Sequence, residues 1–186
     1  MKRILTITIC LFALTFGLMG QTDIETGSCT SITVGKNAST DGSTMTSHTC
    51  DSDFRTWLTM EPSITYQKGD MEPVYKGKLH TDLPWDMRRV TEAGKIPAPE
   101  KTYKFLNTAY PCMNEKQLAM GETTVEGRPE LVNPAGMFQI EELQRIALQR
   151  CSTAREAIKL MGELAQEYGY GDWAECLTII DKNEVW

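Results

Sequence analysis

Cys29 opens a segment whose residue types could do covalent chemistry: residues 29–43 read CTSITVGKNASTDGS. If the preceding residues are removed, Cys29 becomes an N-terminus that carries both a thiol and an α-amine. The amine has an ordinary pKa of about 7.7–8.0 and the thiol one of about 8.5, so the amine can deprotonate the thiol near neutral pH. Such a residue is a nucleophile with its own base, as acyl transfer requires.

The same segment resembles the opening of the cysteine N-terminal-nucleophile dipeptidases, the family of bacterial dipeptidase A and the secernins, whose pattern is roughly C-T-x-h-x-V-G-K-x-A-S-x-D-G-S with h apolar. The resemblance implies an α+β fold, the αββα sandwich of the N-terminal-nucleophile hydrolases. It also implies hydrolysis of dipeptides through an acyl-enzyme on Cys29, with no cofactor. The alternative for Cys29 is a buried or disulfide-bonded cysteine in a hairpin.

Residues 48–53, HTCDSD, follow the turn at a point where relatives commonly read Arg-Asn-Glu-Asp. Asp51 keeps the aspartate of that pattern, which by resemblance would hydrogen-bond the amine of Cys29. His48 stands where arginine is usual and would be a weaker substitute, because histidine is mostly neutral at pH 7 and lacks the guanidinium fork. The alternatives are a solvated loop aspartate and a structural histidine.

Residues 113–124, MNEKQLAMGETT, also resemble the family, where an Asn-Glu turn leads into a strand that bears Gly-Glu-Thr-Thr. In the wider superfamily a residue on that strand helps to form the oxyanion hole. Glu122, Thr123 and Thr124 are the positions near this residue on the strand, and Thr123 is our candidate for the oxyanion hole. A backbone N–H could serve equally, because the donors aimed at the developing oxyanion carry the catalysis. Asn114 is interpreted as a turn residue.

The N-terminal residues have the form of a secretory signal peptide, with Lys2 and Arg3 before an apolar run over 4–19. We expect a signal peptide over 1–20, a short propeptide over 21–28, and the hydrolase portion over 29–186. The protein would then be exported, to the periplasm or the medium. By resemblance, the thiol of Cys29 would cut its own upstream bond. The alternative is a membrane anchor that is never cleaved.

Charge and cysteine content exclude several classes of partner. Removal of residues 1–20 takes away two basic residues and changes the net charge from −6 to −8, which disfavours nucleic acid. No stable membrane insertion is expected after signal cleavage. Five cysteines remain, and an odd number suggests disulfide pairs plus one reactive thiol, which Cys29 would supply. The sequence leaves open whether the other four cysteines pair, and three connectivities are possible. No Cys or His spacing is typical of a metal site. Dipeptide substrates are the expected partners, and a homo-oligomer is compatible with the sequence.

Around these residues the pattern predicts short strands first and helices later. Strands at 30–34 and 43–47 should form a hairpin with Ile32 half-buried and with Cys29 at the tip of a central strand. Residues 56–111 read as loops around short strands. Trp57, Tyr66 and Trp85 are candidates for a substrate wall, although each is more often a packing aromatic.

The second half of the chain should form two strands, two amphipathic helices and a hairpin. Strands are predicted at 103–109 and 117–124, and helices within 137–168. Thr153 and Glu156 form a capping box between the helices. The apolar stripe of the second helix should consist of Ala154, Ile158, Met161, Ala165 and Tyr168. A strand at 175–180 should turn over 181–183.

The chain stops three residues into the returning strand, so we expect an N-terminal fragment of the family's domain. The first functional alternative is an amidase of the choloylglycine or penicillin acylase type, which shares the N-terminal cysteine. The second is an inactive exported fragment that acts only as a binding or structural domain.

Overall fold

The computed structural model describes residues 29–50, 54–55, 57–83, 85–125 and 127–186. Within these ranges the fold is mixed α and β, with three antiparallel sheets and two α-helices, in agreement with the expected α+β class. The expected boundaries of the signal peptide and the propeptide, and Asp51, lie outside the described residues. In the part of the chain that is described, no helix combines the length and the apolar character needed to cross a bilayer.

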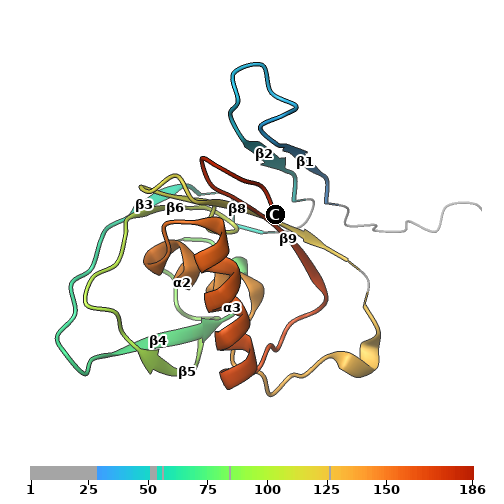
Figure 1. Ribbon diagram of the computed structural model, residues 1–186. Coiled ribbons are helices and arrows are strands. Elements are labelled where there is room, and N and C mark those ends of the chain that lie inside the picture. The colour runs from blue at the N-terminus through green and yellow to red at the C-terminus, as the bar shows by residue number, and fades with distance from the viewer. Residues whose placement is uncertain (1–28, 51–53, 56, 84, 126) are drawn as a thin grey trace, which may run out of the picture.

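A five-stranded antiparallel sheet forms the centre of the fold, and Figure 1 shows it between the first hairpin and the helices. Its strands, in spatial order, are β3 (Thr59–Glu61), β6 (Phe105–Asn107), β7 (Met113–Asn114), β8 (Ala119–Thr124) and β9 (Glu175–Ile180). β8 and β9 pair along their whole length, with Ala119 opposite Ile180 and Thr124 opposite Glu175. The first hairpin packs on this pair of strands.

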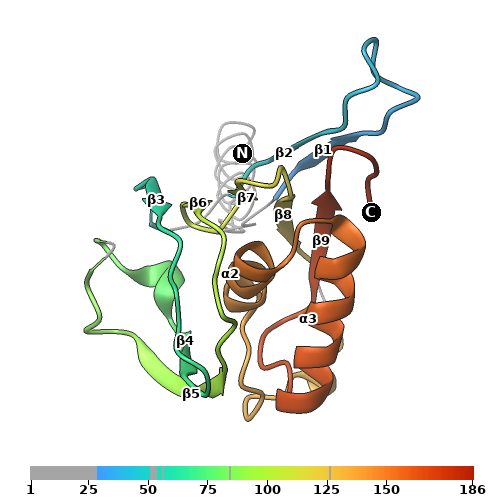
Figure 2. The same cartoon turned by 60° about the vertical axis from the view of Figure 1, so that its left-hand side comes forward.

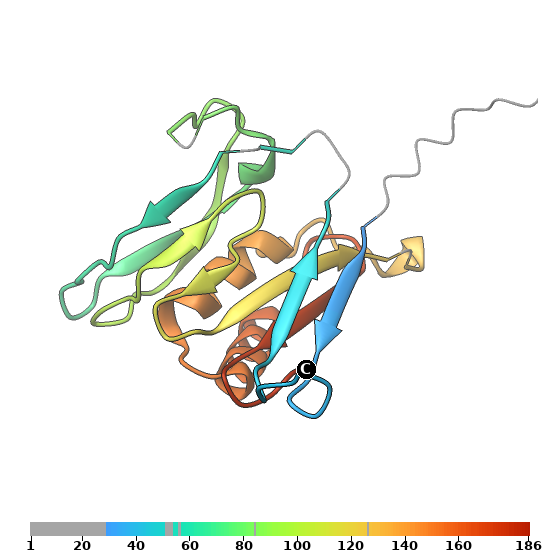
Figure 3. The same ribbon diagram turned by 90° about the horizontal axis from the view of Figure 1, so that it is seen from above.

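The first hairpin is formed as predicted. β1 (Ser31–Val34) pairs with β2 (Met45–His48), with Ser31 opposite His48. The hairpin lies across β8 and β9, as the view from above shows (Figure 3). Gly42, with a φ of +74°, supplies the left-handed backbone that the long turn needs.

Two details of the hairpin prediction are wrong. Among the described residues β1 pairs only with β2, so Cys29 does not precede a central strand of a larger sheet. Ile32 is 63% exposed rather than half-buried. The alternating pattern specifies a hairpin, but it does not specify which neighbouring sheet covers each face.

Two helices cover the face of the five-stranded sheet opposite the hairpin (Figures 1 and 2). They are α2 (Ile140–Arg150) and α3 (Ala154–Tyr168). The capping box of α3 is present as predicted, because Thr153 Oγ1 accepts from the backbone N–H of Glu156. Gly169, with a φ of +83°, ends the helix.

The buried stripe of α3 includes Ala154 and Met161, as predicted, and differs from the predicted stripe at the positions between and after them. Ala157 and Leu164 are buried, whereas Ile158 is 40% exposed. The core contains residues from both helices and from β8 and β9, so packing against two elements, rather than apolarity alone, selects the buried line.

A third sheet of two strands packs beside α2. It consists of β4 (Met71–Lys76) and β5 (Thr91–Pro97), with a register shift between Val74 and Tyr75. Arg145 of α2 pairs with Glu142 at 2.9 Å and also contacts Glu72 of β4. The described residues also form two short 3₁₀-helices, η1 (Lys78–His80) and η2 (Pro129–Leu131).

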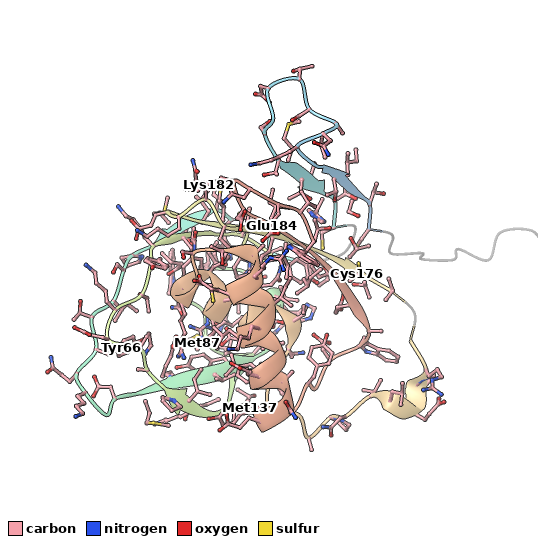
Figure 4. All side chains as sticks on the ribbon, in the orientation of Figure 1. Tyr66, Met87, Met137, Cys176, Lys182 and Glu184 are labelled. Atoms are coloured by element: carbon pink, nitrogen blue, oxygen red, sulfur yellow. The ribbon has the colours of Figure 1, made fainter. Side chains whose placement is uncertain are left out.

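The turn at Asn114 and the turn after β9 both form as predicted. The Asn114 side chain accepts from the N–H groups of Lys116 and Leu118, at 3.0 and 3.1 Å. The Asp181 carboxylate accepts from the N–H groups of Asn183 and Glu184, at 2.7 and 3.1 Å. Glu184 lies close to the N-terminal end of α3, where it binds Arg155 at 2.9 Å (Figure 4).

Candidate functional site

Cys29 and Cys50 lie at the open end of the first hairpin. Just before β1, the N–H of Thr30 donates to Thr49 Oγ1 at 3.0 Å, and the N–H of Thr49 donates to the carbonyl of Thr30 at 2.9 Å. The register continues by one residue, so Cys29 stands across from Cys50. Hairpin pairing therefore brings together two cysteines that are far apart in sequence.

The carboxyl group of Glu122 completes a cluster with the two cysteines. The sulfur atoms of Cys29 and Cys50 and a carboxylate oxygen of Glu122 all lie within 4.8 Å of one another. Both cysteines are half-buried, and Glu122 is only 3% exposed. The strand β8 carries Glu122, so the cluster joins the hairpin to the central sheet. We call these three residues the thiol–carboxylate cluster.

Glu122 is buried next to a second carboxyl group, that of Glu175. Its Oε1 accepts the hydroxyl of Thr124 at 3.0 Å, while its Oε2 has no hydrogen-bond partner among the described residues. Burial and the charge of Glu122 raise the pKa of Glu175, on β9, to about 9. Burial and the same charge also raise the pKa of Tyr110. At neutral pH one carboxyl of the Glu122–Glu175 pair therefore keeps its proton.

His48 lies beside the thiol–carboxylate cluster but is not part of it. Its Nε2 shares a hydrogen bond of 2.8 Å with Thr46 Oγ1, and its ring covers Gly121. Burial lowers the pKa of His48, although the charge of Glu122 opposes the shift. A neutral imidazole at this position packs the hairpin on β8, which agrees with a structural histidine better than with a substitute for arginine.

Thr123, the candidate oxyanion residue, is half-buried on β8 opposite Cys176 of β9. Glu122 and Thr124 share one face of the strand, since their side chains are hydrogen-bonded. Successive side chains alternate along a strand, so the Thr123 hydroxyl is directed to the other face. Asp51, the other residue expected around Cys29, lies outside the described residues.

A cavity of about 360 Å³ adjoins the thiol–carboxylate cluster. It is bounded by β2, by the segment before β7 and by β8, and Glu122 and His48 line it together with Tyr110 and Met120. The lining mixes apolar side chains with a few polar groups, as small-molecule sites do. Glu122 belongs to both the cavity and the thiol–carboxylate cluster, whereas Cys29 and Cys50 do not line the cavity.

The aromatic residues considered for a substrate wall do not line this cavity. Trp57 stacks under the guanidinium of Arg55 at 4.3 Å and donates to the carbonyl of Thr81 at 3.4 Å. Trp85 is 74% exposed. Tyr66, which is half-buried, belongs to a different region, near Glu72. In the described residues these side chains have packing or surface positions.

The expected cysteine pairing is not found. Cys29, Cys112, Cys151 and Cys176 each carry a thiol, and Cys151 is buried in the core. The sequence suggested pairs plus one thiol but left open whether the other cysteines pair, and none of these four residues is in a disulfide. The sequence analysis did not identify Cys50 and Tyr110 as site residues. The hairpin register could have identified Cys50, because extending the pairing from Ser31 back to Cys29 places Cys50 opposite Cys29.

Comparison with known proteins agrees with the resemblance that the sequence suggested. The model of peptidase family C69 matches residues 28–186. A probable dipeptidase of Latilactobacillus sakei is 28% identical over 182 residues, and the match covers 88% of this chain and 35% of the relative. Probable dipeptidase B of Lactococcus lactis is 29% identical over 169 residues, with 86% and 34% covered. The chain thus spans about a third of the length of these relatives.

Proposed function

Because the chain belongs to peptidase family C69, we propose that it hydrolyses dipeptides, with Cys29 as an N-terminal nucleophile. The single observation that carries the proposal is that the sulfur of Cys29 lies within 4.8 Å of a carboxylate oxygen of Glu122, a buried residue that lines a cavity of about 360 Å³. A dipeptide is small enough for such a cavity. The layers of hairpin, central sheet and helices also support an αββα sandwich as the fold of the domain (Figure 2).

Activation requires a free amine on Cys29. We propose that residues 1–20 direct export, that residues 21–28 form a propeptide, and that cleavage of the bond before Cys29 exposes the amine. The amine, with an ordinary pKa of about 7.7–8.0, then takes the thiol proton. Asp51 would hold the ammonium group that results. A backbone N–H of β8 would donate to the oxyanion, because the Thr123 hydroxyl is on the other face of the strand.

Hydrolysis then proceeds in two steps. The thiolate of Cys29 attacks the peptide carbonyl, the C–N bond breaks, and the α-ammonium gives its proton to the leaving amine. Water, deprotonated by the same α-amine, attacks the thioester, and the acid product leaves as the thiol is restored. We assign Glu122 to the free amino group of the substrate, since a carboxylate can pair with an ammonium in a partly buried site.

The experiment that tests this function is intact mass and N-terminal sequencing of the exported protein, followed by kinetics. We expect a start at Cys29 and turnover of dipeptides, and Cys29→Ala should lower kcat/KM by at least about 10⁴-fold without loss of fold. Cys176→Ser is the matched control, because it also removes a thiol. A start near residue 21 that persists on incubation would contradict the mechanism.

A substrate panel distinguishes the remaining functions. Dipeptides should be cleaved at least tenfold faster than penicillin or bile-salt amides. A preference for the acyl amides would favour an amidase, and equal inactivity of the wild-type protein and Cys29→Ala would favour a binding domain.

A further inference from the structure

We propose that the thiol–carboxylate cluster, Cys29, Cys50 and Glu122, is a binding site for a thiophilic divalent cation of the zinc class. The proposal concerns binding and goes beyond the hydrolase function. Its basis is the donor set and its compactness, since two sulfur atoms and a carboxylate oxygen lie within 4.8 Å of one another.

The ligand types favour zinc over other common cations. Thiolate sulfur selects soft or borderline metals, whereas Ca²⁺ and Mg²⁺ take oxygen ligands. In a tetrahedral zinc site with Zn–S bonds of about 2.3 Å, two sulfur ligands lie about 3.7 Å apart. Contraction of the cluster by about 1 Å therefore suffices, which side-chain rotation of two half-buried cysteines can provide.

An independent observation also points to a ligand. Glu122 is 3% exposed, yet its Oε2 has no hydrogen-bond partner among the described residues. Buried polar atoms are nearly always satisfied, and this carboxylate oxygen beside two sulfur atoms is available to a cation. The side chains of Tyr110 and Glu175 approach the same carboxyl group. Thr124 holds the other oxygen at 3.0 Å, which fixes the orientation of the carboxylate as an outer-shell partner does in metal sites.

The remaining coordination position is open to water or to the α-amine of Cys29 after that amine is exposed. Thiol and amine on one residue would close a five-membered chelate ring. Binding breaks two S–H bonds, forms two Zn–S bonds and releases both protons to solvent.

One consequence rests on the proposed function. A cation held by Cys29 occupies the electron pair needed for attack on the substrate. Zinc would therefore inhibit the peptidase reversibly, and a chelator would restore it.

The test titrates the full chain with Co²⁺, a spectroscopic substitute for Zn²⁺, under reducing and metal-free conditions. We expect a sulfur-to-cobalt charge-transfer band in the near ultraviolet that Zn²⁺ abolishes. Cys50→Ser should weaken Zn²⁺ binding by more than about tenfold, since loss of outer-shell partners alone costs 10–100-fold. Cys176→Ser, on β9 and outside the cluster (Figure 4), should leave binding unchanged. A wild-type protein without the band, or a Cys50→Ser variant with wild-type affinity, would overturn the proposal.

A second measurement needs no variant. Zn²⁺ should protect Cys29 and Cys50, but not Cys176, from alkylation by iodoacetamide, as peptide mass mapping reports. Equal alkylation of all three with and without Zn²⁺ would also overturn the site. Neither readout involves turnover, so failure of the metal site leaves the peptidase proposal intact. Conversely, an inactive protein that shows the band keeps the metal site and rejects the function.

Discussion

The imidazole of His48 occupies the space above Gly121 that any larger side chain would need. A Cβ built on Gly121 would collide with the ring atoms Cδ2, Nε2 and Cε1 of His48. This contact packs the first hairpin against β8, and it lies next to Glu122. The absence of a side chain at one strand position therefore lets the hairpin lie close enough for Cys29 and Glu122 to meet.

Gly121→Ala should separate the hairpin from β8. Overpacking of a well-packed site typically costs about 1–3 kcal/mol, and we expect a loss of stability in that range. The displaced hairpin should also lower peptidase activity. Denaturant unfolding and kcat/KM measure the two effects.

Gly162→Ala is the matched control for Gly121→Ala. Gly162 lies on the exposed side of α3, and a Cβ there would contact nothing within 4 Å. Alanine in a helix interior is favoured over glycine by about 1 kcal/mol, so this variant should be more stable than the wild type. Destabilisation of both variants to the same degree would argue against the His48 contact.

Local patterns predicted the elements well, because each has a short-range physical cause. The capping box at Thr153, the hairpin over 31–48 and the strand Glu175–Ile180 all follow from neighbouring residues. The nucleophile candidate, Cys29, was likewise recognised from contiguous residues.

Long-range relationships in the site were not predictable from local patterns. Glu175 and Glu122 meet because β9 pairs with β8 after two intervening helices, and no local signal encodes that pairing. Tyr110 and Cys50 come to Glu122 from separate loops. The burial of Ala157 in place of Ile158 on α3 has the same cause, since the partner elements decide which face is covered.

Asn114→Ala should destabilise the fold strongly, although Asn114 lies at a turn. Its amide donates to the carbonyls of Leu148 and Cys151, at 2.7 and 2.8 Å, and its oxygen accepts from two turn N–H groups. Unsatisfied buried groups cost about 1–3 kcal/mol each, so we expect a loss of at least about 2 kcal/mol in denaturant unfolding. Asn183→Ala, at an exposed turn, should change stability by less than about 0.5 kcal/mol. Equally small losses of stability in both variants would mean that the hydrogen bonds from Asn114 to the end of α2 do not stabilise the fold.

Glu175→Gln should remove a pH dependence of stability. The folded-state pKa of Glu175 is raised from 4.5 to about 9, so between these values the folded chain holds a proton that the unfolded chain releases. Stability from this group is therefore complete below about pH 4.5 and declines as the pH rises towards 9. The neutral glutamine should unfold later than the wild type at pH 8–9 and show a flatter profile.

The control for this profile is Glu163→Gln, since Glu163 is exposed on α3 with Lys159 at 3.8 Å. It should leave the pH dependence of the unfolding midpoint as in the wild type. A wild-type midpoint that changes between pH 5 and 9 in the same way as the midpoint of Glu175→Gln would show that Glu175 ionises normally.

Glu122→Gln should discriminate between substrates with and without a free amino group. Loss of a hydrogen bond to a charged group costs about 1.5–3 kcal/mol, so KM for a free dipeptide should rise by about tenfold or more. The N-acetylated dipeptide lacks the ammonium group, so its KM should be the same for Glu122→Gln and the wild type. Glu163→Gln is the control variant, and its KM should equal that of the wild type for both substrates. A uniform fall in kcat on both substrates would instead mean that Glu122 acts on the conformation of Cys29 and not on the substrate amine.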